Sequence, residues 1–554
     1  MMNGILLLAL WLVPLLLVPL AIRGNSGVWP ILAALPALVA ALLLPDGAQI
    51  EIPWLLLGVQ LGLDAQSRIF LLIAALLWLV AACYVRAWLV DDRTARRFRL
   101  FFLLAMSGNF GVIVGQDLVS FYLGFSVMGL ATYGLVVHGG QPQQRWAGKV
   151  YLAMTLLGEL VLFAAFVLIY QRTGTLAPDM EQLVGGGPWE VGLLILAFAI
   201  KAGVVGVHFW LPLAYVAAPV PATAVMSGAM SKTALIGWLR FLPLGQQAIP
   251  EWGAGLLIAG SVAVLLVIPA GLVQRDPKAV LAYSSIGKMG LMVAALGLAL
   301  REPTLAGGLI AVVVLFAAHH SLAKGALFLG IGLVKNTLSR WTLWLMVLPA
   351  LALAGAPFTS GGLAKAQLSE VLSEGDVLWG NGMLWLLVVA AIGTPLLMAR
   401  FLYLLNCVPR NPIARSRWQL VPWLILVTMM LLLPLIEDDL SDSLSDPWWL
   451  LSALVVAAVV WWRCPDPLAR WVGAIPPGDV LVPLYCGWQK VVELVKGRAQ
   501  VAGNRLSRMS ILKMERIQLK GGRLRGLLLL AGRAGFGSLW LGVTLIFLLL
   551  TVWS

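Results

Sequence analysis

The fold of this chain is decided by residues 196–237, which read LAFAIKAGVVGVHFWLPLAYVAAPVPATAVMSGAMSKTALIG. This stretch is apolar over most of its length, yet it carries Lys201, Lys232 and a helix-breaking run at 208–212. Proline removes a backbone donor and interrupts a helix. At membrane depth, an interrupted helix is tolerated only where its backbone is buried in protein or lines a hydrated cavity. The stretch therefore predicts a bundle of membrane helices with a polar interior.

The composition of the whole chain agrees with this interpretation. The 554 residues are 61% hydrophobic and 11% charged, whereas a soluble domain is about 45–50% apolar and about 25% charged. The mean hydropathy is +0.93. A soluble enzyme and a disordered chain are therefore excluded, and an all-α polytopic membrane protein is predicted.

The net charge of +13 has a simple explanation in the excess of Lys and Arg that cytoplasmic loops carry. It therefore gives no reason to expect a nucleic acid partner. The four cysteines show no metal-ligand spacing. The sequence contains no phosphate-binding loop and no dinucleotide fingerprint. We expect no cofactor, no metal site and no catalytic redox centre in this chain.

Apolar runs predict about 16 transmembrane helices. They lie at 3–22, 28–45, 67–86, 99–116, 118–138, 147–170, 190–213, 219–243, 253–273, 279–299, 306–334, 341–369, 380–403, 417–436, 447–463 and 526–552. These spans and their charges divide the chain into N-terminal helices (1–98), two repeats (99–245 and 253–403), additional helices (404–463), a basic segment (464–525) and a C-terminal helix (526–554).

The loops between these spans alternate in charge. Basic loops include 86–99, 275–278 and 400–417, and acidic or neutral loops include 46–64 and 437–446. Because cytoplasmic loops collect Lys and Arg, the N-terminus is predicted to lie outside. The first apolar run has no basic region before it, so we interpret it as a membrane helix and not as a signal peptide. We expect a multi-pass protein of the bacterial cytoplasmic (inner) membrane.

Residues 463–525 carry 12 Lys and Arg against 4 acidic residues. Apolar positions recur there at helical spacing between the basic ones. This pattern is typical of an amphipathic helix on the anionic cytoplasmic surface of the membrane lipid, and a plain basic linker fits it equally well. A soluble cytoplasmic subunit is also a candidate partner for residues 464–525.

Ionisable residues within the apolar spans carry the functional signal, because a charge at the bilayer centre costs about 2.5–3.5 kcal/mol on insertion scales. The candidate proton path comprises Glu159, Lys201, Lys232, His320, Lys324 and Lys365. Additional candidates are Lys288, His319 and His208. An isolated member would fit a structural ion pair or a snorkelling side chain, but a series of titratable groups across several helices is what proton transfer through a membrane requires.

Spacing and helix breakers order these candidates. His320 and Lys324 are four residues apart and share one helix face, whereas His319 points about 100° away. His208 precedes the break at 210–212, where it is a candidate donor to freed backbone carbonyls. Lys365 follows a second break, at Gly355–Pro357. Five spans, an odd number, separate the two interrupted helices, so the two repeats are predicted to be inverted.

Four stretches then resemble a known family: 201–241, DPKAVLAYSSIGKMG (276–290), HHSLAKGALFLGIG (319–332) and LALAGAPFTSGGLAKAQL (351–368). They resemble the antiporter-like, proton-translocating subunits of respiratory complex I, membrane-bound hydrogenases, multisubunit cation/proton antiporters and inorganic-carbon uptake complexes. The resemblance, weaker outside these stretches, covers about residues 60–400. It implies two inverted five-helix repeats with broken helices and a central Lys/Glu chain that conducts protons.

The resemblance also assigns roles. Lys201 matches the lysine of the first broken helix, Lys232 a connecting lysine and Lys365 the terminal lysine, while His320 and Lys324 match a central pair. This sequence departs from the usual pattern of the family at two positions. Ser126 stands where the family usually has a glutamate, so Glu159 on the next helix is a candidate replacement. Lys288 stands where an uncharged polar residue is more usual.

Three functions remain open at this point. The first is a proton-translocating subunit of a multisubunit complex that is driven by a redox or hydrogenase module or works in cation/proton antiport. The second is a proton-conducting partner of a cytoplasmic carbonic-anhydrase-like zinc subunit in bicarbonate uptake, which the absent glutamate and the basic segment would suit. The third is a proton-inert scaffold. Genes neighbouring this one, or co-purifying subunits, would distinguish them.

Overall fold

The computed structural model describes residues 2–23, 27–55, 57–89, 94–337, 340–374, 378–411, 417–436 and 475–478. All of them belong to the first of two compact units, Met1–Val482. The spans predicted at 447–463 and 526–552 lie outside the described residues, as does all of the basic segment apart from 475–478.

The described part of the chain is mainly helical. Its α-helices are α1 (Met2–Leu16), α2 (Val18–Arg23), α3 (Trp29–Leu43), α4 (Ala65–Trp88), α5 (Ala95–Val114), α6 (Leu118–Val136), α7 (Pro142–Thr173), α8 (Met180–Leu183), α9 (Pro188–Ala202), α10 (Trp210–Ala217), α11 (Val220–Gly228), α12 (Thr233–Phe241), α13 (Pro250–Leu272), α14 (Pro277–Arg301), α15 (Ala306–Lys335), α16 (Trp341–Leu345), α17 (Val347–Ala354), α18 (Ser360–Glu374), α19 (Leu378–Asn406) and α20 (Arg417–Leu432). Short 3-10 helices are η1 (Met230–Lys232), η2 (Pro303–Leu305) and η3 (Leu433–Ile436).

Among the described residues, nine helical stretches are long and apolar enough to cross a membrane. Three shorter apolar helices, Trp29–Leu43, Trp341–Ala354 and Gln419–Leu435, accompany them. Expected spans are interrupted at α9–α10, at α11–α12 and at α17–α18. The chain is therefore a multi-pass helical membrane protein with several broken helices.

The helical bundle carries one short β-hairpin that the sequence did not predict. Residues 48–63 form an antiparallel hairpin of β1 (Ala48–Ile52) and β2 (Val59–Leu63), with Ile50 opposite Leu61. In β1, Ile50 and Ile52 alternate with polar Gln49 and Glu51, which is the period of a strand and not of a helix. The segment is too short and too polar to span a bilayer, so pairing with itself satisfies its backbone groups.

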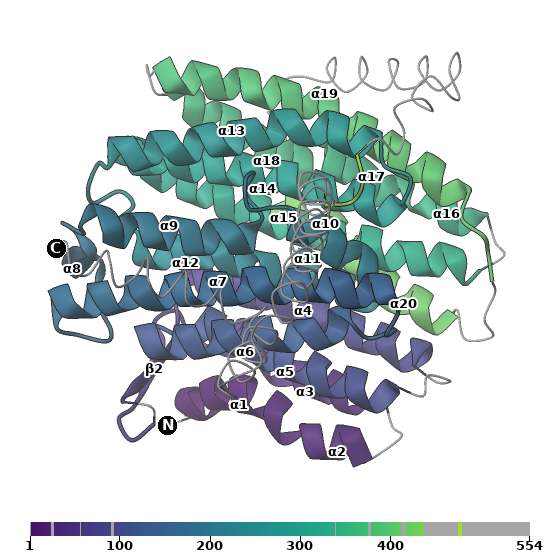
Figure 1. Cartoon of the computed structure of the whole chain (residues 1–554), viewed down its shortest axis with the longest axis horizontal. Helices are drawn as coiled ribbons and strands as arrows, with labels where there is room; N and C mark the ends of the chain where they lie inside the picture. The colour runs from purple at the N-terminus through teal and green to yellow at the C-terminus, as the bar shows by residue number, and fades with distance from the viewer. Residues whose placement is uncertain are drawn as a thin grey trace, which may run out of the picture. The chain divides into compact units, whose positions relative to one another are not determined.

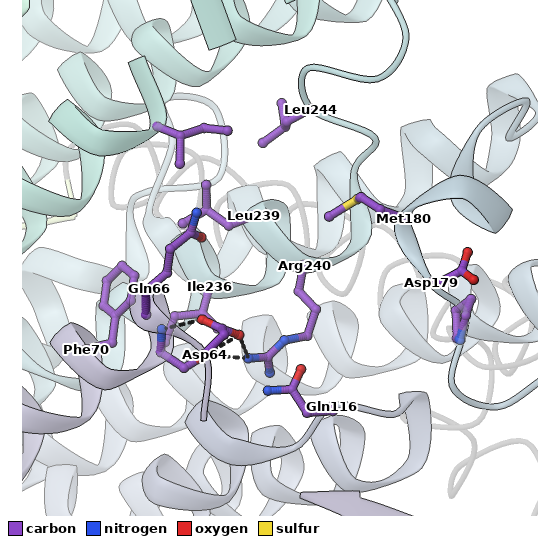
Figure 2. A pocket seen from close by; sticks show the side chains of 14 residues that line it. Asp64, Gln66, Phe70, Gln116, Asp179, Met180, Ile236, Leu239, Arg240 and Leu244 are labelled. Atoms are coloured by element: carbon purple, nitrogen blue, oxygen red, sulfur yellow. Dashed lines mark hydrogen bonds and ion pairs between the residues drawn. The ribbon is translucent and has the colours of Figure 1, made fainter. Parts of the chain in front are cut away.

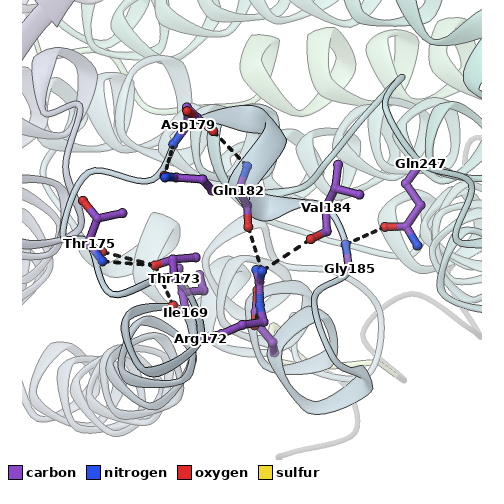
Figure 3. A network of polar contacts seen from close by, with 10 residues as sticks. Ile169, Arg172, Thr173, Thr175, Asp179, Gln182, Val184, Gly185 and Gln247 are labelled. Carbon is purple, nitrogen blue, oxygen red and sulfur yellow. Dashed lines mark hydrogen bonds and ion pairs between the residues drawn. The ribbon is translucent and has the colours of Figure 1, made fainter.

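The hairpin marks one end of the bundle, here called the hairpin end. The amide of Gln116 donates to the carbonyl of Gln60, and the amide of Leu118 donates to the carbonyl of Leu176. On the loop before α9, the amide of Gly185 donates to the side chain of Gln247 (Figure 3). The loops predicted to lie outside therefore meet at one end of the molecule.

An ion pair secures this end. Arg172, at the end of α7, makes two hydrogen bonds to Glu190 at the start of α9, at 2.9 and 2.7 Å. Its guanidinium also donates to the carbonyls of Gln182 and Val184 (Figure 3). Bidentate pairing of this kind fixes geometry as well as adding energy.

The loops predicted to be cytoplasmic meet at the opposite end. Lys278 donates to the carbonyl of Ala218, at 2.5 Å, and Arg400 donates to that of Gln274. The amide of Asn411 donates to the carbonyl of Lys335. The carbonyl of Ile475, in the described part of the basic segment, accepts from Gln274 at this same end. The predicted alternation of loops is confirmed here as two distinct ends, and which end faces the cytoplasm stays a prediction.

The helices lie side by side between these ends, with α1, α3 and α5 on one side and α13, α14 and α19 on the other (Figure 1). Small residues bring the backbones of α13 and α14 together. A Cβ atom on Gly253 would lie 2.6 Å from the carbonyl oxygen of Gly297. Close approach through small residues is how membrane helices gain packing energy without a hydrophobic driving force. It leaves α14 buried along nearly its whole length.

Candidate functional site

The central element of the site is α15, which carries three of the predicted residues. His319, His320 and Lys324 are 1%, 0% and 0% exposed. Helix α15 packs against α11 from the first predicted repeat and against α14, α17 and α18 from the second. Its side chains can therefore reach groups from both halves.

His320 faces the first half. Its Nδ1 atom lies 2.6 Å from Nζ of Lys232, which is in η1. The same Nζ donates to the carbonyl of Ser227 at 2.7 Å and contacts the hydroxyl of Ser231 at 3.3 Å. The Ser227 carbonyl is available because α11 ends at Gly228. Sequence spacing grouped His320 with Lys324, and the structure adds Lys232 as the direct partner of His320.

His319 faces the second half. Its Nδ1 atom lies 2.8 Å from the hydroxyl of Ser360, the first residue of α18. A Cβ atom on Gly361 would lie 2.9 Å from the imidazole, so glycine there makes room for the ring. Adjacent histidines on a helix point about 100° apart, and here that rotation sends one ring to each half of the bundle.

Lys365 sits at the second predicted break. Helix α17 ends at Gly355, which has φ +82°, and α18 begins at Ser360. Nζ of Lys365 donates to the carbonyl of Ala354 at 2.6 Å. An ammonium at the carboxyl end of a helix satisfies a freed carbonyl and opposes the negative end of the helix dipole. The break therefore fixes the position of this lysine.

Lys201 sits at the first predicted break in the same way. It is in the last turn of α9, which ends at Gly203 with φ +72°. The carbonyl of Ile200 accepts a hydrogen bond from the indole of Trp210, at the start of α10. Nζ of Lys201 lies 5.2 Å from the centre of the Phe125 ring, within cation–π range. His208 is buried in the linker between the two helices, and its carbonyl accepts from the amide of Leu211.

The two broken helices run in opposite directions. Helix α9 starts at the hairpin end, where Glu190 pairs with Arg172, and α10 finishes where Lys278 binds Ala218 at the opposite end. Helix α18 instead finishes near the hairpin end, where Val371 contacts Gly308 just after η2. This antiparallel arrangement agrees with the predicted inversion.

Glu159 is a buried carboxylate whose charge acts on Lys201. It is 5% exposed, on α7, and interacts electrostatically with Lys201 and with Ser126. A Cβ atom on Gly129 would lie 2.6 Å from its Oε1 atom, so the carboxylate rests against the backbone of α6. Within the described ranges no ion pair of 4.0 Å or less joins Glu159 to Lys201, so the interaction acts over a longer distance.

Lys324 and Lys288 complete the second group of cations. Nζ of Lys324 donates to the carbonyl of Leu281 on α14 at 2.7 Å. Lys288, also on α14 and 3% exposed, interacts electrostatically with Lys365 and His319. The interacting groups are Lys232, Lys288, His319, His320, Lys324 and Lys365. Because like charges in a low dielectric repel strongly, these groups cannot all hold protons at once.

Buried hydroxyl groups near Glu159 and near Lys232 were not predicted from the sequence. Buried Tyr151 lies near Glu159, Thr132 and Thr155, and its hydroxyl donates to the carbonyl of Gly129. Buried Tyr215 lies near Ser227 and Ser231, which contact Lys232. The signal in the sequence was the spacing of Ser227 and Ser231, four residues apart in an apolar stretch.

An all-helical bundle with broken helices and buried Lys and His defines an antiporter-like membrane subunit. The chain belongs to the NADH:quinone oxidoreductase/Mrp antiporter transmembrane family, whose profile matches residues 115–394, just over half of the chain. The resemblance predicted from the four motifs is thereby confirmed.

Two relatives match this chain over only part of its length. The chain is 28% identical over 300 residues to hydrogenase-4 component B of Escherichia coli, covering 52% of this chain and 45% of that protein. It is 26% identical over 333 residues to a Na(+)/H(+) antiporter subunit of Alkalihalophilus pseudofirmus, covering 56% of this chain and 66% of that protein. The chain thus spans less than half of the first relative and under two thirds of the second.

Two solved structures share the fold. The Mrp complex from Dietzia superposes with a TM-score of 0.71 at 20% identity, covering 97% of this chain and 63% of that one. The archaeal membrane-bound sulfane sulfur reductase superposes with a TM-score of 0.66 at 19% identity, covering 98% and 99%. At these identities the likeness establishes the fold alone.

Proposed function

We propose that this chain is the proton-translocating subunit of a multisubunit, energy-coupled membrane complex. Protons move along Glu159, Lys201, Lys232, His320, Lys324 and Lys365. The driving energy comes from other subunits, through redox chemistry, a hydrogenase module or cation exchange. The relatives named above belong to complexes of these kinds, and the family membership of this chain supports a similar assembly.

The contact between Lys232 and His320 is the observation that carries the proposal. It joins a lysine of the first proposed repeat, 99–245, to the central helix of the second, 253–403. A nitrogen–nitrogen distance of 2.6 Å requires one proton between the two lone pairs. Either Lys232 is an ammonium that donates to neutral His320, or His320 donates to a neutral amine. The pair therefore passes a single proton from one half to the other.

Repulsion among the remaining cations couples the successive proton transfers. When Lys324 or Lys288 gains a proton, a proton on the Lys232–His320 pair becomes less favourable. In the first half, Glu159 supplies the opposite charge that stabilises a proton on Lys201. A change in the distance between Glu159 and Lys201 would load or release that proton, and the series would move one charge at a time.

Flux measurements on lysine variants test the proposal. The complex containing the full chain is reconstituted in vesicles, and lumen acidification is followed with a pH-sensitive dye. We expect Lys201→Ala and Lys324→Ala to abolish flux while assembly persists. Lys149→Ala, which removes an exposed lysine on α7, is the matched control. Wild-type flux in both assembled variants would exclude the proton path.

A further inference from the structure

A cavity of about 520 Å³ opens at the hairpin end. Its polar lining comes from the start of α4, from Gln116 and from Asp179, and includes Asp64 and Gln66. Figure 2 shows Asp64 facing Arg240, with Gln116 beside the guanidinium. None of the residues that line this cavity belongs to the buried series described above.

The deeper lining is apolar and comes from the two halves of the bundle. Phe70 lies more than a turn into α4, Ile236 lies a turn before Arg240 on α12, and Ile310 lies a turn into α15. Polar side chains and the apolar Pro178, Met180 and Leu244 thus line the cavity where its helices meet the solution, and the lining toward the middle of the bundle is apolar.

One face of α12 connects this cavity to the proton path. Ile236 and Arg240 are four residues apart, so they share one face of α12. Lys232, the last residue of η1, precedes Ile236 by four residues. Ile236 and Arg240 line the cavity. Lys232 is one turn deeper, about 6 Å along the axis, and contacts His320.

Arg240 holds neighbouring helices together and does not serve to bind a molecule in the cavity. Its guanidinium donates to the carbonyls of Val112, Ile113 and Gly115 at the end of α5 and to the hydroxyl of Ser67. Its side chain is 11% exposed, and it forms an ion pair with Asp64 at 4.0 Å. With both terminal nitrogens of its guanidinium hydrogen-bonded, Arg240 holds the end of α12 against α4 and α5.

The charges favour cations over anions in the cavity. Two carboxylates, Asp64 and Asp179, share the lining with one guanidinium. A cleft with one sign of net charge concentrates ions of the opposite sign. Protonated water is therefore a better occupant than an anionic substrate.

We propose that this cavity is a water-filled vestibule that exchanges protons between the hairpin-side solution and the Lys232–His320 pair. Ile236 is its hydrophobic gate, since an apolar constriction conducts only when it becomes wet. The role in transport rests on the proposed function, whereas access of water to Ile236 does not.

Cysteine accessibility tests the two parts separately. In a variant whose four cysteines are replaced by serine, Ile236→Cys is exposed to a small membrane-impermeant thiol reagent from each side. We expect modification from the hairpin side, about tenfold faster with a cationic than with an anionic reagent. Leu235→Cys is the matched control, because Leu235 is the preceding residue of α12, is 0% exposed and does not line the cavity.

Modification of Ile236→Cys is then expected to block proton flux. Reaction no faster than that of Leu235→Cys, or only from the opposite side, would overturn the vestibule. Full flux after complete modification would overturn its place on the path. Leu239→Cys, which also lines the cavity, is a second reporter should Ile236→Cys fail to assemble. Absence of flux in the unmodified complex would refute the proposed function and leave the labelling result intact.

Discussion

Nζ of Lys232 and Nδ1 of His320 lie 2.6 Å apart although 88 residues separate them in the chain. The lysine is held by the carbonyl at the end of α11, and the histidine is held in the middle of α15. Among the described residues, no other side chain from the opposite half forms a hydrogen bond with the side chain of Lys232 or of His320. In the proposed proton path, this contact is the step that joins the two proposed repeats.

Removal of either member of this pair is expected to stop transfer between the halves. Lys232→Met and His320→Leu should each lower proton flux about 100-fold, the scale of a lost acid–base group. The double variant should be no slower than either single one, because both substitutions break the same step. Flux in reconstituted vesicles measures this, and losses that multiply in the double variant would contradict it.

Glu159 is expected to supply the counter-charge for Lys201. Glu159→Gln keeps the shape but removes the charge, so it should impair flux strongly while the complex still assembles. Adding Ser126→Glu should restore part of the flux, because Ser126 adjoins Glu159 on the neighbouring helix. A fully active Glu159→Gln variant would show that the first half works without an internal acid. Ser126→Glu in the otherwise unchanged chain is the control.

The Arg172–Glu190 pair is expected to contribute to stability and not to transport. The side chain of Glu190 is 7% exposed, and Glu190→Gln leaves Arg172 without this charged partner. We expect a loss of about 2–3 kcal/mol, measured as a lower melting temperature in detergent. Flux per folded complex should be unchanged. Glu181→Gln, a substitution in the neighbouring short helix, is the control, and equal melting temperatures for the two variants would refute the prediction.

The orientation predicted from loop charge is testable with single cysteines. Positions within 86–99 and 463–525 should react only from the cytoplasmic side, and positions within 437–446 only from outside. The stretch 437–446 lies outside the described residues, so labelling tests the count of spans there independently. Reaction of cysteines within 437–446 from the cytoplasmic side would contradict the predicted number of membrane spans.

Local sequence was enough to predict the apolar helices of the described part of the chain and their alternating ends. Hydrophobicity and the helical rise act residue by residue, so Lys201 and Lys365 are predicted within apolar spans and next to breaks at 208–212 and 355–357. In the structure α9 and α17 end earlier, at Ala202 and Ala354. The hairpin at 48–63 was not predicted, because its strands are short and lie in a loop between two predicted membrane spans.

Tertiary packing decided which groups meet. Spacing on one helix placed His320 beside Lys324, but rotation of α15 against α11 directs His320 to Lys232 and directs His319 to Ser360. These pairings depend on the crossing and rotation of helices distant in the chain, which no local pattern encodes. The same holds for Arg240, whose carbonyl partners at the end of α5 come more than 120 residues earlier. The sequence by itself determined that protonatable groups lie within apolar helices, and packing of the helices determined which of these groups meet.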